Sequence, residues 1–321
     1  MTFHKVRFLE WVCENPKGLV ALPTGRTPEF FIKYLERYKN NWDDAAVQAE
    51  IKSCGYSHRT YPDTSALTFV MLDEFFPMLP THRNSFCNYI KNFYVSILEI
   101  PESNVMNFDL VGHQVLTSEE LHIFNSIDVD LSLLTRAAVG EAELRQKDIL
   151  LRVTSFCEAY ESRLEEMGGI GFFLGGIGPD GHIAFNQQGG DHNSVTRLVN
   201  FNYPSAAAAA ADLGGIEIAR GKAAMTIGLR TITANPDATI IIMAAGEGKA
   251  SVVRAAIEDS VDEERPASVL QSHRGARFYL THGAAMLLTV HSSYVYILRC
   301  SRITHTLITP ESPTINNNTY R

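Results

Sequence analysis

The sequence predicts a single α/β domain with a doubly wound, Rossmann-like and mainly parallel sheet flanked by helices. Short apolar runs typical of buried strands alternate with helical segments along the 321 residues. We find no internal repeat and no linker that divides the chain. Apolar residues make up 45% of the chain and charged residues 20%, which is typical of a globular protein with a sizeable core.

The expected strands are short apolar runs that end at glycine, proline or acidic residues. They lie at 19–22, 68–72, 170–174, 196–199, 238–243 and 277–280, with a further candidate at 292–298. The expected helices lie at 8–13, 29–35, 84–98, 142–166, 206–211 and 249–257. Residues 40–65 predict a helix fragment followed by a long surface loop. The last ~15 residues are rich in threonine, serine and asparagine, which predicts disorder there.

Charge and cysteine content exclude several classes of protein. The net charge is −8 and no stripe of lysine and arginine is present, which argues against a nucleic-acid partner. The five cysteines are scattered without a CxxC pair, so we expect reduced thiols and neither a disulfide framework nor a metal site. No apolar run reaches the ~18 residues that span a bilayer, and the N-terminus does not resemble a signal peptide. These features predict a cytoplasmic protein with no membrane partner.

The loop after the strand at 170–174 is the strongest candidate site. Three glycines within four residues expose the backbone, and Asp180 and His182 follow directly. Ligands of open α/β sheets bind outside the carboxyl ends of the strands. Asp180 and His182 are therefore candidate catalytic residues.

A second candidate site follows the first strand. The turn contains Thr24, Gly25, Arg26 and Thr27 before Pro28, with Thr27 as a plausible N-cap and Pro28 at the first helical position. Free N–H groups at a helix start favour a phosphate, and arginine is a natural bidentate phosphate donor. Most strand–turn–helix corners bind nothing, so this turn alone does not establish a phosphate site.

Two further features leave alternatives open. Asp73 and Glu74 follow the strand at 68–72, where adjacent acids serve either as a helix-start cap or as a catalytic carboxylate. On spacing alone the cap is the commoner role. Six consecutive alanines at 206–211 favour a helix that lies either over a cleft as a light, mobile cover or plainly on the surface.

Four segments carry recognisable motifs, at 22–28, 71–75, 175–186 and 222–228. In this order they resemble motifs of the glucosamine-6-phosphate deaminase (isomerase) family, whose superfamily also holds the 6-phosphogluconolactonases. The stretch Ile183-Ala184-Phe185-Asn186 resembles the deaminases, where a lactonase would have threonine, alanine and serine. The resemblance covers roughly residues 18–288, with apparent insertions near 40–65 and 127–148. It implies a domain at 1–288 with a short N-terminus and an atypical tail at 289–321.

The resemblance implies conversion of glucosamine 6-phosphate and water to fructose 6-phosphate and ammonia, without a metal or organic cofactor. It implies that the Thr24–Thr27 turn and Lys222 hold the phosphate, and that Asp73 moves a proton between C1 and C2. His182 would act in ring opening, with Asp180 orienting its imidazole. The family is commonly oligomeric, so a homo-oligomer is expected.

The sequence departs from the family pattern at two site positions. Gln187 stands where the family usually has a glutamate that completes an acid–histidine–acid set, so a Gln187→Glu variant is expected to open the sugar ring faster. The phosphate-binding arginine of the family's lid falls near Ala211, and Arg26 is a candidate replacement for that charge. These departures keep a non-catalytic sugar-phosphate-binding paralogue as an alternative, with a 6-phosphogluconolactonase as a further one.

Overall fold

A computed structural model describes residues 3–25, 28–124, 127–213, 215–289 and 295–298. Its centre is a seven-stranded sheet in the order β10-β9-β8-β5-β1-β2-β4, in which every neighbouring pair is parallel. The strands are β1 (Leu19–Ala21), β2 (Thr68–Val70), β4 (Val105–Met106), β5 (Phe172–Gly176), β8 (Thr239–Ala244), β9 (Ala276–Thr281) and β10 (Val295–Leu298). The predicted parallel α/β sheet is confirmed.

The strand order places a topological switch point between β1 and β5. From β1 the chain builds β2 and β4 on one side, then crosses to β5 and continues through β8, β9 and β10 on the other. The connections that leave β1 and β5 therefore run in opposite directions and open a crevice at the carboxyl ends of these strands. The Thr24–Gly25 turn and the Asp180–His182 loop both start at this crevice.

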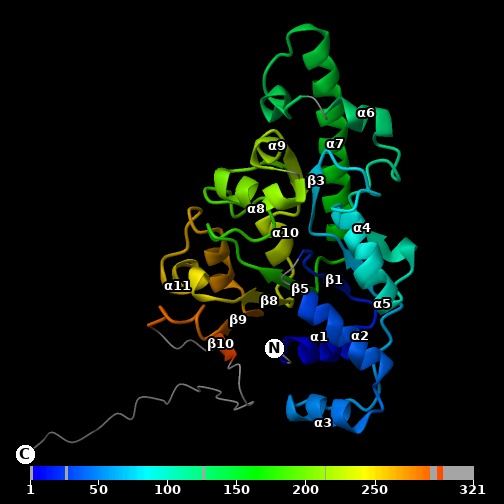
Figure 1. Ribbon diagram of the computed structural model, residues 1–321, viewed down its shortest axis with the longest axis vertical. Helices are drawn as coiled ribbons and strands as arrows, with labels where there is room; N and C mark the ends of the chain where they lie inside the picture. Colours follow the sequence, from blue (N-terminus) through cyan, green and yellow to red (C-terminus); the bar gives the residue numbers. More distant parts are fainter. Residues whose placement is uncertain (1–2, 26–27, 125–126, 214, 290–294, 299–321) are drawn as a thin grey trace, which may run out of the picture.

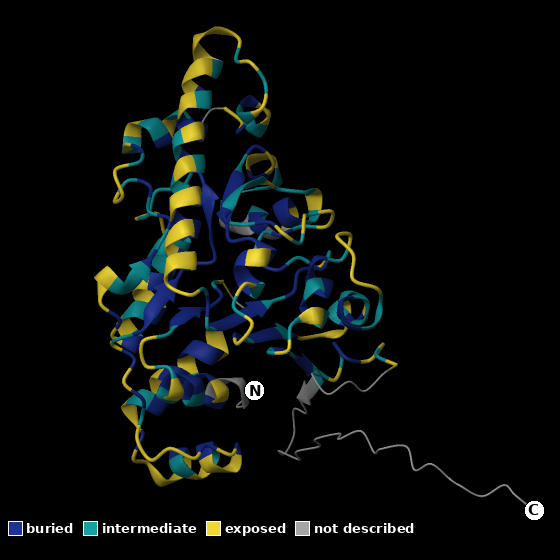
Figure 2. Cartoon of the chain, turned by 180° about the vertical axis from the view of Figure 1, so that it is seen from behind, coloured by how far each residue is buried: buried dark blue, intermediate teal, exposed yellow. Residues whose placement is uncertain are grey.

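Helices surround the sheet (Figure 1). They are α1 (Phe3–Glu14), α2 (Glu29–Asn40), α3 (Ala45–Ser53), α4 (Phe86–Ile90), α5 (Ser96–Leu98), α6 (Ser118–Ile123), α7 (Gly140–Glu166), α8 (Tyr203–Leu213), α9 (Ile216–Arg220), α10 (Leu229–Thr233) and α11 (Ala250–Glu258). A π-helical turn (Lys91–Val95) joins α4 to α5. Figure 2 shows buried strands at the centre and an exposed outer face along α7.

Aromatic side chains pack α1 and α2 against the middle of the sheet. The ring of Phe8 lies 5.7 Å from that of Phe31 on α2 and 5.2 Å from that of Phe172 on β5. All three side chains are fully buried. Since burial of such a side chain contributes roughly 1.5–3 kcal/mol, this cluster fixes the helices beside the switch point. The sequence predicted only residues 8–13 of the full helix α1.

A separate antiparallel sheet of three strands carries Asp73. Its order is β3-β7-β6, with β3 at Asp73–Phe76, β6 at Arg197–Asn200 and β7 at Ala223–Thr226. The prediction that Asp73 and Glu74 end the strand at 68–72 was wrong. β2 ends at Val70, and the acids begin a new strand because they pair with Thr226 and Met225 of β7.

A buried carboxylate joins this small sheet to α7. Glu161 Oε2 accepts hydrogen bonds from Thr196 N at 3.0 Å, Thr196 Oγ1 at 2.5 Å and Thr231 Oγ1 at 2.8 Å. Three donors satisfy a carboxylate that would be costly to bury alone. Glu161 therefore fixes the start of β6 relative to the long helix.

The remaining sequence predictions agree with the structure where they can be compared. α7, α8 and α11 lie at the predicted helical segments, and residues 40–65 hold α3 followed by a loop. In the segment after residue 288, β10 pairs with β9 from Val295 to Leu298. The predicted disordered end lies outside the described residues. Among the helices that the structure describes, none combines the length and apolarity needed to cross a bilayer.

Candidate active site

A cavity of about 340 Å³ lies at the switch point. The turn after β1, the start of β3, the glycine loop after β5, α8 and the segment after β8 form its wall. Its polar side chains are Thr24, Asp73, His182, Ser205 and Lys249. This volume falls within the range of small-molecule sites. α8 lies over the cavity, which agrees with one of the two interpretations of the alanine run.

Asp180 and His182 form a hydrogen-bonded pair beside the cavity. His182 Nδ1 lies 2.5 Å from Asp180 Oδ1, and both side chains are largely buried. Burial alone would raise the pKa of Asp180, but hydrogen bonds from His182 and Asn202 outweigh it and hold that pKa well below its ordinary value. Asp180 is therefore a carboxylate that accepts the Nδ1 proton, which leaves Nε2 of His182 for a ligand.

The sequence left open whether Asp73 and Glu74 cap a helix or line the site, and the structure gives one position to each residue. Glu74 accepts hydrogen bonds from Ser85 Oγ at 2.6 Å and from the backbone N–H of Phe86 and Cys87, so it caps α4. Asp73 lines the cavity instead. Burial, with a smaller contribution from the neighbouring Glu74, raises the pKa of Asp73 to about 8.

Lys222, a predicted phosphate contact, is not among the described residues that line the cavity. Its Nζ donates to the carbonyl of Phe124, and burial lowers its pKa. The β3–β7 register pairs Asp73 with Thr226, four residues beyond Lys222. Lys222 is thus roughly 13 Å from Asp73 along the ladder.

Among the described residues that line the cavity, Lys249 is the one lysine or arginine. It follows β8, the neighbour of β5, and therefore reaches the same edge of the sheet as His182. Burial lowers the pKa of Lys249, partly offset by the charge of Asp180. The sequence did not single out Lys249. It could have been found because it follows a glycine turn at the end of a strongly apolar strand.

Gln187 does not contact His182 among the described hydrogen bonds. Its Nε2 donates to Asn200 O at 2.6 Å, and its Oε1 accepts from Asn202 N. In place of the family's acid–histidine–acid set, the structure therefore has only the Asp180–His182 pair among these residues. Gln187 is held by the segment that leads into α8. The backbone of position 211 is part of α8. Arg26 and Thr27 lie outside the described residues.

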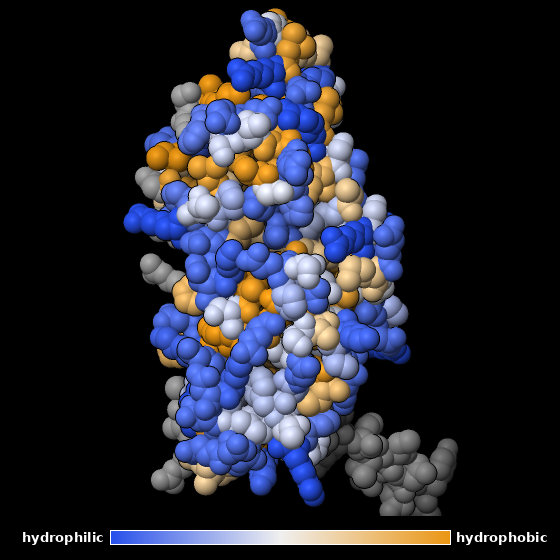
Figure 3. Space-filling model, turned by 90° about the vertical axis from the view of Figure 1, so that its right-hand side faces the viewer, coloured by the Kyte–Doolittle hydropathy of each residue, from blue (hydrophilic) through white to orange (hydrophobic). Residues whose placement is uncertain are grey.

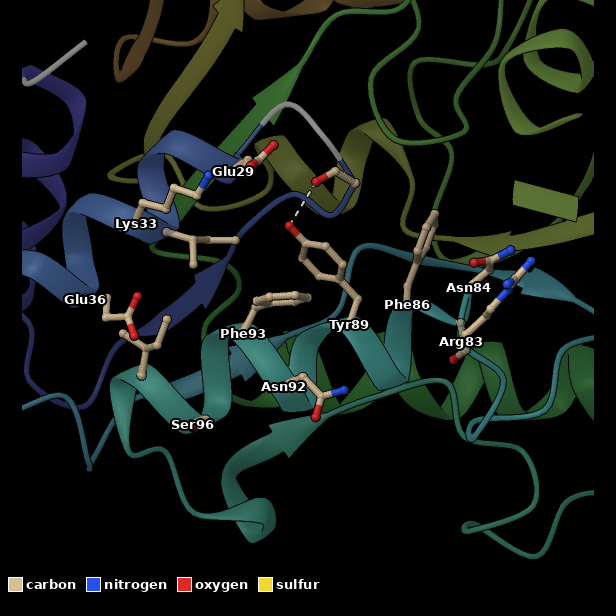
Figure 4. A pocket seen from close by; sticks show the side chains of 14 residues that line it. Glu29, Lys33, Glu36, Arg83, Asn84, Phe86, Tyr89, Asn92, Phe93 and Ser96 are labelled. Carbon is tan, nitrogen blue, oxygen red and sulfur yellow. Dashed lines mark hydrogen bonds and ion pairs between the residues drawn. The ribbon is translucent and has the colours of Figure 1, made fainter. Parts of the chain in front are cut away.

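A second hollow of about 580 Å³ adjoins the cavity between α2 and the α4–α5 run (Figure 4). The two share Gly25 and Phe86. Tyr89 Oη donates to Gly25 O at 2.9 Å, the bond drawn in Figure 4. Gly25 has φ of 81°, a left-handed conformation that suits glycine. Tyr89, which the sequence did not single out, thus fixes the turn that carries Thr24.

Comparison with known proteins identifies sequences and structures that are similar to this chain. No protein-family model matches the chain. A glucosamine-6-phosphate deaminase of Rhodopirellula baltica is 28% identical over 280 residues, which cover 87% of this chain and 88% of that protein. One of Clostridium perfringens is 29% identical over 279 residues, which cover 87% and 91%. Over most of its length the chain is thus similar in sequence to proteins named glucosamine-6-phosphate deaminase.

Another deaminase of this name, from Caenorhabditis elegans, is 38% identical over 134 residues, so the match spans about half of that relative, 49% of its length. Among solved structures, a monomeric glucosamine-6-phosphate deaminase of the NagB superfamily superposes with a TM-score of 0.63 at 22% identity, covering 89% of this chain and 95% of that one. A 6-phosphogluconolactonase from Leishmania guyanensis gives 0.55 at 17% identity, covering 90% and 97%. These two structures share the fold of the chain.

Proposed function

We propose that the chain is an enzyme that converts glucosamine 6-phosphate and water to fructose 6-phosphate and ammonia. One observation carries the proposal most directly. A buried carboxyl, Asp73, lines the same cavity as His182 of the Asp180–His182 pair, and its pKa is raised to about 8. A group that titrates near the working pH can both accept and return a proton. The relatives named glucosamine-6-phosphate deaminase support this reaction class.

We assign ring opening to the Asp180–His182 pair. Nε2 of His182 takes the proton of the anomeric hydroxyl and delivers it to the ring oxygen as the bond between C1 and that oxygen breaks. Asp180 stabilises the imidazolium through Nδ1. The products of this step are the open-chain aldehyde and the restored imidazole.

We assign isomerisation to Asp73. The carboxylate removes the C2 proton while the 2-ammonium group gives a proton to O1, which yields a neutral enolamine. Asp73 then returns its proton to C1, which leaves an iminium at C2. Water adds at C2 and the nitrogen departs as ammonium, so atoms and charge balance. Every step is a proton transfer or the addition of water, which these side chains can support. The proposal therefore assigns no cofactor.

We place the phosphate between the Thr24–Gly25 turn and Lys249. A cation half-buried in the cavity and a turn before α2 are the groups that bind a phosphate. Arg26 and Thr27 remain predicted contributors from the same turn. Lys222, directed to Phe124, is not part of this assignment.

The decisive measurement is ammonia release from glucosamine 6-phosphate by the purified chain. Acid release from 6-phosphogluconolactone is the parallel assay for the lactonase alternative. The lack of contact between Gln187 and His182 favours, as the second candidate, a protein that binds sugar phosphate without turnover. If neither product is released but a sugar phosphate still raises Tm, the second candidate is selected.

We also propose that the chain works in the cytoplasm as a homo-oligomer. Large apolar side chains are exposed on and beside α7, among them Val139 at 78% and Leu144 at 59%. Figure 3 shows apolar surface gathered on the upper half of one face. Exposed apolar patches commonly mark interfaces. Light scattering of the purified chain tests this, and a single monomeric species would reject it.

A further inference from the structure

We propose that Asn202 is a positioning residue that couples the Asp180–His182 pair to α8, the helix that covers the cavity. The coupling to catalysis rests on the proposed function. Asn202 precedes α8 and lies between the helix and the glycine loop. Neither its backbone nor its side chain is assigned a role in the reaction above.

The side-chain amide of Asn202 uses its two ends for two different elements. Its Nδ2 donates to Asp180 Oδ2 at 2.8 Å, while Asp180 Oδ1 faces His182. Its Oδ1 accepts from Ser205 N at 2.9 Å, which satisfies a free donor in the first turn of α8. One rigid amide therefore sets both the carboxylate and the start of the helix.

Gln187 holds Asn202 from the other side. Asn202 N donates to Gln187 Oε1, and Gln187 Nε2 donates to Asn200 O at 2.6 Å. This clamp needs one acceptor and one donor, which an amide supplies and a carboxylate does not. Gln187 is thus matched to this arrangement, whereas a glutamate could not hold Asn200.

It follows from this proposal that α8 and the Asp180–His182 pair move together. α8 contributes Ser205 and Ala209 to the cavity wall. A displacement of its first turn would pull Asn202 away from Asp180 and release one carboxylate oxygen. Asp180 also interacts electrostatically with Lys249, and it lines a further hollow together with Arg254, Glu264 and Arg265. Asn202 is the neutral donor among these groups.

The test variant is Asn202→Ser, which keeps an N-cap oxygen but is too short to reach Asp180. We expect kcat for ammonia release to fall roughly 10- to 100-fold with a smaller change in KM, the effect of losing a hydrogen bond to a charged group. The pH at which the Asp180 carboxyl titrates, followed by NMR, should move upward, because Asp180 loses a donor that stabilises its charge. Asp44→Ser is the matched control, since Asp44 caps α3 away from the cavity.

A spectroscopic readout separates this inference from the proposed function. The hydrogen bond between His182 Nδ1 and Asp180 predicts a downfield proton resonance for His182, which should shift in Asn202→Ser, where Asp180 loses its other side-chain donor, and stay in place in Asp44→Ser. This signal does not require turnover, so it can be read even if the parent releases no ammonia. An unchanged resonance overturns the coupling. So does an active Asn202→Ser variant whose only change is a lower Tm.

Discussion

Gly178 lies directly against the imidazole ring of His182. A Cβ atom at position 178 would lie 2.1 Å from His182 Cε1 and 2.3 Å from both ring nitrogens. Gly178 N also donates to His182 O at 2.8 Å. Because Asp180 holds Nδ1, the ring is fixed between the glycine turn and the carboxylate.

Gly178→Ala should therefore displace the imidazole and lower kcat for ammonia release. A displacement of about 1 Å at a reacting group can cost roughly 100-fold in rate. Kinetics together with Tm would separate this from unfolding. Gly248→Ala is the control, since a Cβ there meets no atom within 4 Å. Full activity in Gly178→Ala would mean that the position of the ring is not limiting.

The raised pKa of Asp73 predicts the pH dependence of activity. The carboxylate form must remove the C2 proton, so kcat/KM should rise with pH through about 8. Asp73→Asn should lose roughly 100- to 10,000-fold of the isomerisation rate. Exchange of the C2 proton with deuterated solvent measures this step. A variant that still exchanges it at the parent rate would assign the proton transfer to another group.

The same carboxyl should make the fold less stable as the pH rises. Its folded pKa of about 8 exceeds the ordinary value of 3.8, so the folded state binds more protons between these values. The free energy of unfolding therefore falls as the pH rises through this interval. Asp73→Asn should raise Tm at pH 8 by roughly 5 °C and change it little at pH 4. Calorimetry across this range checks it, and parallel curves for parent and variant would contradict it.

Local pattern was enough to predict the strands of the main sheet except β4, which has only two residues. The runs that became β5 and β8 are apolar throughout and end at glycines, as buried parallel strands do. The break between β2 and β3 was not predictable in this way. Residues 68–76 are buried on both sides of the break, and the pairing of Asp73 with Thr226, about 150 positions away, decides where the second strand begins.

The residues of the candidate site also fall into those that local sequence could predict and those that it could not. Asp180 and His182 lie two positions apart in one glycine loop, so the sequence itself brings them together. Lys249 and Asn202 reach the site only through the order of strands and the path into α8. Lys222 was placed there because its motif follows in order, whereas the register of β7 points it to Phe124.

Two lysine variants test the proposed phosphate assignment. Lys249→Ala should raise KM for glucosamine 6-phosphate roughly 10- to 100-fold, the loss expected for a charge-assisted hydrogen bond. Lys222→Ala should leave KM within experimental error, since its ammonium is bound to Phe124 outside the cavity. Steady-state kinetics with inorganic phosphate as competitor gives both values. The reverse pattern would restore the assignment made from the sequence.

For Gln187→Glu, the structure predicts slower ring opening, whereas the sequence alone predicted faster ring opening. The clamp on Asn202 uses the amide of Gln187 as donor and acceptor, and a carboxylate would face the carbonyl of Asn200 without a proton to donate. We therefore expect Gln187→Glu to lower Tm and to slow ring opening rather than speed it. Gln188→Glu is the neighbouring control, because Gln188 contacts Glu264 and not the clamp. Comparing turnover of the β-pyranose with that of the open-chain form isolates ring opening. A faster variant would show that a charge at this position reaches His182 after all, and that the clamp rearranges at little cost.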